Sequence, residues 1–356
     1  MESTPPIAGK RIVISGAGIA GLSFARALDR FWPAEHEKPT VAMRTLGLLE
    51  ELLQQSTTSA SDVSELPCAW DKDWTLIGKF NAPKPLEGLP VNRVRIFRRT
   101  LRNILLQALP EIATVNWKKG CNSAQNLSSG KVAVTLDDGS KDECDLLIVA
   151  DGANSMLRSH LVPEDNLDYA GVVCMMGTSR FPYGKPAPLT KDWGICFSGQ
   201  GIPFLTFPVD DNNGVWALTY RSETPIKPIR GLEAIKCKDE ILDQVRCRGH
   251  MFAEPFDQSI SASDPETLQV FNAMQKNPDP TLFIGDANHA MTPFSGNGAN
   301  MALMDGVELG RQLSSPATVR QAVVNFDAES SPRSQAAIDQ AWWIIRILHS
   351  RGFFIG

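Results

Sequence analysis

The sequence predicts an α/β protein with an inserted mixed β-sheet and a C-terminal helix. An apolar, strand-like run at 11–15 leads into a glycine-rich turn and then a helical pattern. From about 168 to 259 the chain changes to β-branched and aromatic segments separated by turns such as 211–214. The tail from 328 to 350 is helical in pattern, interrupted by Pro332. These features together favour two packed domains followed by a helical segment.

Length and composition agree with that architecture. The chain has 356 residues, of which 43% are hydrophobic and 21% charged, enough for about two domains with cores of their own. Its formal net charge is −5. An acidic chain lacks the positive field that phosphate backbones attract, so we expect small-molecule ligands and no nucleic acid.

Signals for export, membrane insertion and metal binding are not expected either. The N-terminal residues 1–10 show no basic segment followed by an apolar one, and the most apolar stretch of the tail, 341–348, is interrupted by Arg346. Seven cysteines form an odd set without a CxxC pair. We therefore predict a cytoplasmic protein with reduced thiols, no stable membrane insertion and no metal site.

The glycine-rich turn is the first motif with chemical meaning. Its sequence is Gly16-Ala17-Gly18-Ile19-Ala20-Gly21, between the strand at 11–15 and a helix from Leu22. Strand, glycine turn and helix in this order indicate a Rossmann-like dinucleotide-binding unit, in which Gly16 permits the tight turn, Gly18 lets a pyrophosphate approach and Gly21 allows close packing. The alternative is a glycine-rich turn without a ligand.

A second strand ending in an acidic residue should follow, but the sequence does not supply it. The chain passes from Glu35 through Thr40 almost directly into a helical pattern beginning at Met43. Either the fold is unusual here, or roughly 20 to 30 residues of an ordinary βαβ unit are missing between Thr40 and Met43. We favour the second interpretation.

The remaining elements alternate between helices and strands. Residues 67–95 read as short strands and loops, and 98–109 as an amphipathic helix with Leu101, Leu105 and Leu109 at helical spacing. A strand at 132–136 enters a turn, and the buried strand 145–150 ends at Asp151-Gly152. The last strand, 281–284, leads to Gly285-Asp286, a glycine-rich loop and a helix over 298–313.

Three separated motifs together resemble the class A FAD-dependent monooxygenases, the para-hydroxybenzoate hydroxylase group. The motifs are the glycine turn 16–21, DLLIVADGANSMLR at 145–158 and LFIGDANHAMTPFSGNGANMALMDGVEL at 282–309. They resemble the GxGxxG, DG and GD motifs of that family. With the run RRTLRNILL from Arg98, the resemblance is closest to the tetracycline-inactivating branch and similar fungal enzymes.

The resemblance implies FAD as cofactor and assigns residues to it. Asp286, after Gly285, would accept hydrogen bonds from the ribityl hydroxyls. The alternative is an aspartate that only caps the N-terminus of a helix. The loop before the helix would direct backbone amides at the flavin's N1 and C2 carbonyl. Its residues are Pro293, Gly296, Asn297, Gly298, Ala299 and Asn300.

Three further side chains follow from the same resemblance. Arg98 corresponds to the family arginine that reaches FAD, with Arg99 as the alternative if the register shifts by one. Asp151 corresponds to an aspartate that braces the pyrophosphate region and supports NAD(P)H use, with Arg158 pairing nearby. His289 matches a family position but receives no catalytic role. No catalytic side chain is assigned.

The implied reaction is therefore borne by the flavin. NAD(P)H would reduce FAD, O2 would add at C4a, and the hydroperoxyflavin would hydroxylate an aromatic or polycyclic small molecule, tetracycline-like or polyketide-like. No G-x-S-x-G, H-E-x-x-H or Walker A motif supports another chemistry. The alternatives are a flavin oxidase or reductase of the same fold, or a non-catalytic nucleotide-binding module.

The inserted sheet would hold the substrate, because its strands carry aromatic and methionine side chains suited to a flat conjugated molecule. We expect contacts from among Met175, Met176, Phe197, Phe204, Phe207 and Trp216, and from Pro293. The predicted domains are an FAD-binding domain (1–66, 98–165 and 266–315), a substrate-binding sheet domain (67–97 and 166–265) and a C-terminal helical segment (316–356). The protein is expected to be a monomer or a homodimer.

Overall fold

The structure is a computed structural model that forms two compact units. It describes residues 5–31, 42–56, 67–80, 94–190, 192–278, 283–315 and 317–352. Unit 1 comprises 1–55, 96–168 and 274–341, and unit 2 comprises 56–95, 169–273 and 342–356. The predicted gap before Met43 involves residues 32–41, which lie outside the described residues.

Unit 1 contains a short parallel sheet that supports the glycine turn. Strand β1 (Ile12–Ser15) pairs in parallel with β7 (Leu146–Val149), and Val149 of β7 forms a parallel bridge with Phe283. All four residues of β7 are buried, as its unbroken apolar sequence predicts. Because parallel strands end at the same edge, the turns that follow β1, β7 and Phe283 lie close together.

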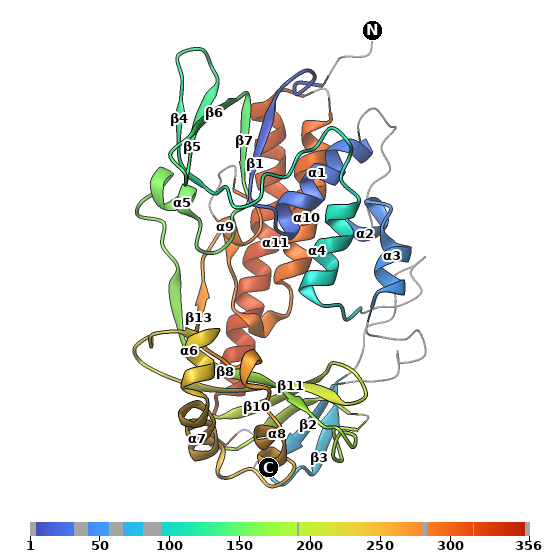
Figure 1. Ribbon diagram of the computed structural model, residues 1–356, viewed down its shortest axis with the longest axis vertical. Coiled ribbons are helices and arrows are strands. Elements are labelled where there is room, and N and C mark those ends of the chain that lie inside the picture. The colour runs from blue at the N-terminus through green and yellow to red at the C-terminus, as the bar shows by residue number, and fades with distance from the viewer. Residues whose placement is uncertain are drawn as a thin grey trace. The chain divides into compact units, whose positions relative to one another are not determined.

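Two helices of unit 1 pack unusually closely. Helix α1 (Ile19–Phe31) follows the glycine turn, and α10 (Gly298–Leu313) crosses it through small residues (Figure 1). A Cβ on Gly306 of α10 would lie 2.0 Å from Ser23 Oγ and 2.8 Å from the Ala20 carbonyl oxygen. The absence of a side chain at Gly306 is therefore what allows the two helices to approach.

The rest of unit 1 surrounds this centre. An antiparallel meander packs with α5 and β7 around a core that includes Val134, Leu157 and Phe283. Its strands are β4 (Cys121–Asn126), β5 (Val132–Leu136) and β6 (Lys141–Cys144), and α5 is Met156–Leu161. The other helical segments of unit 1 before α11 are α2 (Ala42–Thr45), α3 (Leu49–Gln54), α4 (Arg98–Gln107), α9 (Asp286–His289) and η3 (Pro293–Ser295).

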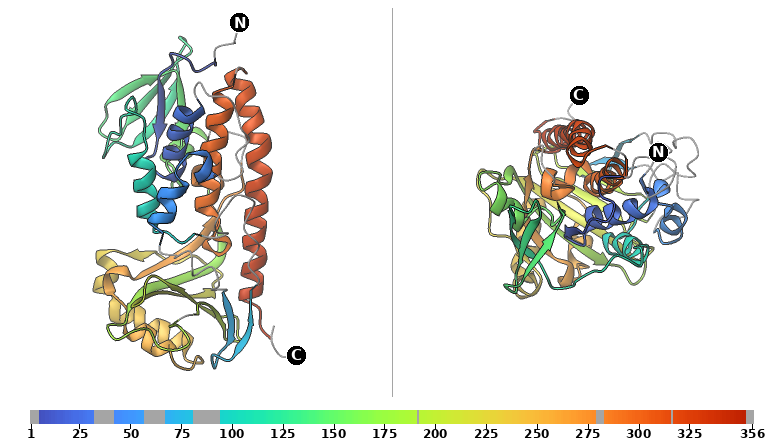
Figure 2. Two further views of the ribbon diagram at one scale, coloured as in Figure 1. Left: turned by 90° about the vertical axis from the view of Figure 1, so that its right-hand side faces the viewer. Right: turned by 90° about the horizontal axis from the view of Figure 1, so that it is seen from above.

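The predicted C-terminal helix is a single long element, α11 (Val319–Leu348). Pro332 lies inside it instead of ending it, although proline lacks the amide hydrogen that the helix would use. Contacts with α10, beside which α11 runs in Figure 2, offset that loss: Arg333 and Ser330 both donate hydrogen bonds to Asp305. The residues of α11 up to Ala341 belong to unit 1 and the rest to unit 2.

Unit 2 is built on a mixed sheet of eight strands, in the order β12-β13-β8-β11-β10-β9-β2-β3. Neighbours are antiparallel in the pairs β8/β11, β11/β10, β10/β9 and β2/β3, whereas β2 and β9 are parallel. The strands are β2 (Cys68–Asp71), β3 (Leu76–Lys79), β8 (Asp168–Arg180), β9 (Gly194–Phe197), β10 (Pro203–Pro208), β11 (Asn213–Arg221), β12 (Ile229–Arg230) and β13 (Gln269–Gln275).

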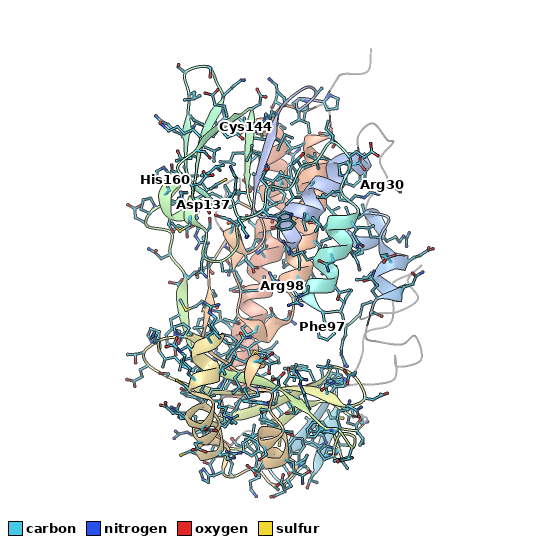
Figure 3. All side chains as sticks on the ribbon, viewed as in Figure 1. Arg30, Phe97, Arg98, Asp137, Cys144 and His160 are labelled. Carbon is cyan, nitrogen blue, oxygen red and sulfur yellow. The ribbon has the colours of Figure 1, made fainter. Side chains whose placement is uncertain are left out.

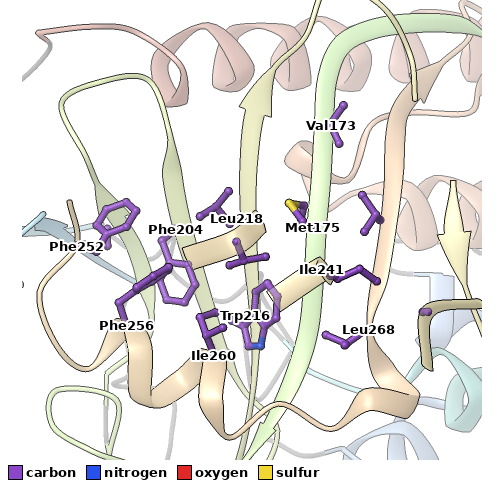
Figure 4. Close-up of a cluster of buried hydrophobic side chains, with 14 of the residues drawn as sticks. Val173, Met175, Phe204, Trp216, Leu218, Ile241, Phe252, Phe256, Ile260 and Leu268 are labelled. Atoms are coloured by element: carbon purple, nitrogen blue, oxygen red, sulfur yellow. The ribbon is translucent and has the colours of Figure 1, made fainter. Parts of the chain in front are cut away.

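One face of this sheet is covered by helices that the sequence pattern did not reveal. The expectation of continuous β-structure up to 259 is wrong beyond β12, because α6 (Leu232–Lys236), α7 (Lys238–Gly249) and α8 (Phe256–Ser261) occupy the stretch, followed by η2 (Pro265–Thr267). α6 and α8 have only five and six residues, and the 12-residue α7 buries only Ile241, Val245 and Gly249, so none of them has a clear apolar period. Between helices and sheet lies an apolar core that includes Phe204, Trp216 and Ile260 (Figure 4).

Candidate active site

In the glycine turn, close packing leaves no room for a side chain at Gly16 and Gly21, but it leaves open space at Gly18. Gly16 has φ +110°, and a Cβ there would lie 2.3 Å from the Ala150 carbonyl oxygen at the end of β7. A Cβ on Gly21 would lie 2.2 Å from the Gly16 carbonyl oxygen. At Gly18 it would meet no atom within 4 Å. The turn is therefore locked onto β7 while its Gly18 backbone stays accessible to a ligand.

The turn after β7 places Asp151 directly against the glycine turn. The Asp151 Cα would be 2.9 Å from a Cβ on Gly16. Its Oδ2 accepts a 3.5 Å hydrogen bond from the Leu157 amide, whereas its buried Oδ1 has no partner among the described residues. Such an orphaned acceptor is rare in a folded interior and is consistent with a donor supplied by a ligand.

Arg158 connects the second motif to the third. Its buried guanidinium donates to the carbonyl oxygens of Ala153 at 2.5 Å and Ala287 at 2.9 Å, and its amide is capped by Ser155 Oγ. The sequence placed Arg158 near Asp151 as a partner; in the structure its described hydrogen bonds go to main-chain oxygens. Arg158 thus holds the Asp151 turn against α9.

The third motif begins with a turn that only glycine fits. Gly285 has φ +60°, and a Cβ there would lie 2.8 Å from Ala20 Cβ of α1. Asp286 follows as the first residue of α9, and its Oδ2 lies 3.7 Å from Nη2 of Arg98. Arg98 is labelled beside α4 in Figure 3. Its Oδ1 lies 3.9 Å from a Cβ placed on Gly298. Asp286 is therefore close both to Arg98 and to the N-terminus of α10.

The N-terminus of α10 is not capped by a side chain of its own N-cap residue or first turn. Gly296 is in the left-handed conformation (φ 64°, ψ 8°), and Asn297, the N-cap residue, makes no capping hydrogen bond; its side-chain amide instead donates to Gln340 Oε1 at 3.3 Å. No acidic residue occupies the first turn, which contains Ala299 and Asn300. The amides of a 16-residue helix are thus available to an electron-rich ligand.

Arg102 is a residue near the site that sequence reasoning did not assign. Its Nε donates a 2.7 Å hydrogen bond to the Ala17 carbonyl oxygen, inside the glycine turn. The guanidinium also lies 4.9 Å from the ring centroid of Trp117. The available signal was spacing: Arg102 stands four residues after Arg98, so both arginines point from the same side of α4.

His289, which received no catalytic role, is a hydrogen-bond partner of Asp305. The two side chains are buried, and His289 Nε2 lies 2.5 Å from Asp305 Oδ2. Burial raises the pKa of Asp305, but attraction to His289 and Arg333 outweighs it, so the pKa is lowered overall. Burial lowers and Asp305 raises the pKa of His289, with a net increase. Both shifts favour the charged forms of the two side chains.

The predicted substrate residues fall on two faces of the sheet in unit 2. Met175, Phe204 and Trp216 are almost fully buried in the apolar core beneath α6–α8. Because side chains alternate along a strand, Met176, Phe197 and Phe207 point to the opposite face. Phe207 is 37% exposed, and its ring centroid lies 5.8 Å from that of Trp193. Met175, Phe204 and Trp216 thus pack in the core of unit 2.

That opposite face also contains residues that sequence reasoning did not name. Leu205 pairs with Ala217, which pairs with Met176, so the three lie in one row across the sheet. All three are half-buried. Leu205 and Ala217 directly follow Phe204 and Trp216, which sequence reasoning did name. Knowing which strand residues face the helices would therefore have been enough to find them.

Comparison with known proteins places this assembly in a family. A family model described as an FAD binding domain matches residues 42–341. The monooxygenase cfoF of Aspergillus candidus is 32% identical over 387 aligned residues, covering 96% of this chain and 92% of that protein. The chain belongs to the FAD-dependent monooxygenases. The aligned length exceeds the 356 residues of this monooxygenase, so the relative contains residues without a counterpart here.

Other proteins to which the monooxygenase is similar include a longer relative and solved structures of the same fold. Spinacia oleracea zeaxanthin epoxidase is 27% identical over 85% of this chain, which spans about half (47%) of its length. A variant of Klebsiella pneumoniae HpxO complexed with FAD has the same fold, with a TM-score of 0.78 and 21% identity over 96% of this chain and 91% of that one. Tetracycline destructase Tet(51) follows at a TM-score of 0.64 and 18% identity, covering 96% and 91%.

These comparisons confirm the predicted fold class, the family and FAD as the cofactor. The residues of the site fit FAD: Gly18 leaves space for a ligand, Asp151 keeps an unpartnered oxygen, and the α10 amides are uncapped. Among the helices that the structure describes, none is both long and apolar enough to cross a membrane. The individual roles of the site residues stay predictions.

Proposed function

We propose that this FAD-dependent monooxygenase uses NAD(P)H and O2 to hydroxylate an aromatic or polycyclic small molecule. The observation that supports it most is the position of Asp286. One carboxylate lies between Arg98 of α4 and the N-terminus of α10, on a turn held against α1. A flavin with its ribityl chain at Asp286 would then be directed by residues from all three motifs.

The three motifs divide the work of holding FAD. The turn of Gly16, Gly18, Ala20 and Gly21 offers amides and the α1 N-terminus to the pyrophosphate. Asp151 supplies an unpartnered carboxylate oxygen beside that turn. Arg98 and Asp286 would bind the ribityl and phosphate portions, where charge-assisted hydrogen bonds are stronger than neutral ones. When bound, FAD supplies the hydride acceptance and oxygen activation that side chains lack.

The loop 293–300 has an electrostatic task. Its backbone amides, from Gly296 to Asn300, would face the electron-rich pyrimidine edge of the flavin and stabilise negative charge there. The first turn of α10 contains no acidic residue of its own that would reduce this positive potential. Pro293 would limit the freedom of this loop because its φ angle is fixed.

The chemical class of the substrate follows from aromatic side chains and from relatives. Phe197 and Phe207, on the sheet face opposite α6–α8, suit a flat conjugated substrate. Solved proteins of this fold include HpxO complexed with FAD and uric acid, two tetracycline destructases and a salicylate hydroxylase substrate complex. We propose a tetracycline-like or polyketide-like ring system, as suits a relative of a fungal monooxygenase.

The proposal is tested with purified protein reconstituted with FAD. NADH and NADPH oxidation, O2 uptake and H2O2 release are followed with tetracycline, salicylate and urate as separate candidate substrates. We expect one of these compounds to accelerate NAD(P)H oxidation. Its product should be heavier than the compound by about 16 mass units, the mass of one oxygen atom. Loss of two hydrogens from a candidate substrate with one H2O2 per turnover and no NAD(P)H consumption would instead indicate an oxidase.

The site itself is tested by Asp286→Asn. Loss of the charge should weaken FAD binding by about tenfold or more, read from quenching of flavin fluorescence. Asp138→Asn is a matched control, since Asp138 lies in an exposed turn where its partners are Ser140 and Lys119. Equal FAD affinity of the Asp286→Asn and wild-type proteins would refute the assignment.

We also propose a cytoplasmic location, because all seven cysteines are free thiols and five of them are buried. We further propose that the protein is a monomer or a homodimer. Light scattering coupled to size-exclusion chromatography gives the oligomeric state directly.

A further inference from the structure

Asp305, in the middle of α10, is a fully buried carboxylate with four donors from three separate elements. Its Oδ2 accepts hydrogen bonds from the Gly285 amide at 2.8 Å and from His289 Nε2 at 2.5 Å. Its Oδ1 accepts from Ser330 Oγ and from Arg333 Nη2, both at 2.8 Å. One side chain thus connects the turn before Asp286 to α9, α10 and α11.

A buried charge of this kind is stable only when its neighbours satisfy it. Moving a carboxylate out of water costs several kcal/mol, and removal of one partner leaves the others uncompensated. Here two hydrogen bonds reach each carboxylate oxygen, so both oxygens are satisfied. The network is therefore held in one geometry, and a small shift of any donor would be costly.

The geometry of this network determines where Asp286 lies. Gly285 has a left-handed φ of +60°, which the Asp305 carboxylate secures by accepting its amide hydrogen. Asp286 is the next residue, and His289, the other donor to Oδ2, ends the same short helix. Both ends of α9 are thus fixed to one carboxylate. A four-residue helix has little stability of its own, so the hydrogen bonds to Asp305 stabilise α9.

We propose that Asp305 is the positioning residue for the flavin site: it fixes the Gly285–Asp286 turn so that the Asp286 carboxylate is presented to FAD, and it does so by tying that turn to Arg333 and Ser330 of α11. This inference rests on the proposed role of Asp286. Asp305 itself does not contact the cofactor. It acts on FAD through the main chain of Gly285.

A purely structural role for Asp305 makes a different prediction. If it only stabilised the packing of α10 on α11, its loss would lower the free energy of unfolding without acting through Asp286. In a positioning role, Asp305 affects FAD affinity only through Asp286. Substitution of Asp305 should then have no further effect on FAD affinity once Asp286 has been substituted. Residues that act as one unit give non-additive effects in a double-mutant cycle.

The experiment measures the Kd for FAD by fluorescence quenching for the wild type, Asp305→Asn, Asp286→Asn and the double variant. We expect Asp305→Asn to weaken binding about tenfold, in keeping with loss of a charged hydrogen-bond acceptor. The double variant should bind no more weakly than Asp286→Asn alone. Circular dichroism and thermal unfolding of the apoprotein verify that each variant is folded.

Glu308→Gln is the matched control. Glu308 lies one turn further along α10, is largely buried and is hydrogen-bonded to Arg311 and Gln312, whereas its described partners do not include α9. Its substitution removes a buried charge from the same helix and should leave the FAD Kd within about twofold of the wild type.

The outcomes separate the two proposals. If Asp286→Asn weakens FAD binding and Asp305→Asn does not, or if the two effects multiply, the positioning role is overturned while the site stands. If Asp286→Asn has no effect, both fail. Should Asp305→Asn not fold, Ser330→Ala and Arg333→Gln each remove one donor from α11 and must give a smaller loss that again vanishes in the Asp286→Asn background.

Discussion

The two units of this protein are stabilised in different ways. Around the site in unit 1, glycines bring backbones into contact and buried charges are paired: Gly306 lies against α1, and Asp305 binds His289 and Arg333. In unit 2 the largest core is apolar and aromatic, with Phe204 in ring contact with four neighbours at centroid distances of 4.9 to 6.4 Å.

The contrast reflects what each unit must do. A cofactor site needs amides and carboxylates at fixed positions, and these require close backbone approaches and satisfied charges. A sheet covered by helices needs only well-packed volume, which large apolar side chains supply. We therefore expect substitutions in the apolar core of unit 2 to act on stability. Substitutions around the glycine turn of unit 1 should act on stability where a Cβ would clash with the protein, and on FAD affinity where it would not.

The largest effect is expected from Phe204→Ala. Phe204 is fully buried and its ring contacts Trp74, Trp216, Phe252 and Phe256, so the substitution leaves a cavity in the core of unit 2. We expect a loss of about 3 to 5 kcal/mol in the free energy of unfolding, measured with urea. Phe207→Ala, on the opposite face, is the control and should cost far less. Equal losses would mean that the two faces are packed alike.

Gly306→Ala should follow, at about 3 kcal/mol. Its Cβ would be 2.6 Å from the Phe24 amide nitrogen and 2.8 Å from the Ala20 oxygen, and main-chain atoms cannot move aside without separating α1 from α10. Met304→Ala, a partly exposed position on α10, is the control. Thermal unfolding of the apoproteins measures the difference. A wild-type melting temperature for Gly306→Ala would show that the close helix contact is not required.

Gly18→Ala sharpens the comparison because it separates binding from folding. A Cβ there meets no protein atom within 4 Å, so the apoprotein should be as stable as the wild type, while FAD binding weakens about tenfold as the methyl group occupies ligand space. Gly78→Ala is matched, since that glycine is equally open but lies in β3. Fluorescence quenching gives both Kd values. Unchanged affinity for Gly18→Ala would place FAD elsewhere.

The smallest effect concerns Asp327, next to the charged network of unit 1. Burial and then the nearby Asp305 raise the pKa of Asp327 from 3.8 to about 6. The protonated carboxyl is favoured in the folded state, so stability is complete below about pH 4 and declines as pH rises through 6. Asp327→Asn should therefore be more stable than the wild type at pH 8, by about 1 kcal/mol after allowance for partial exposure.

Urea unfolding of Asp327→Asn at pH 4 and pH 8 measures that difference, which should nearly vanish at pH 4. Asp339→Asn, at an exposed position of α11, is the control and should show no such pH dependence. A gain of the same size at both pH values would show that the carboxyl of Asp327 does not ionise in this range.

Much of the site was predictable because its parts are local. An apolar run followed by Gly16, Gly18 and Gly21 predicts strand, turn and helix, and the structure has β1 and α1 there. The substrate face was less accessible, since a shift of one residue along a strand exchanges the two faces, as Met175 and Met176 show. The helices α6–α8 were not predicted because α6 and α8 are too short to show a clear period and α7 buries few apolar side chains.

The amino-acid order alone determined the α/β architecture and the glycine turn, because backbone sterics and side-chain periodicity act within a few residues of each position. It indicated FAD only through the resemblance of its three motifs to a known family. Only the folded chain decided that Arg102 reaches the Ala17 oxygen, that Arg158 binds the Ala287 oxygen and that Asp305 gathers donors from α9 and α11. Such contacts join segments up to 129 residues apart, and their partners depend on how helices and strands dock, which no local pattern specifies.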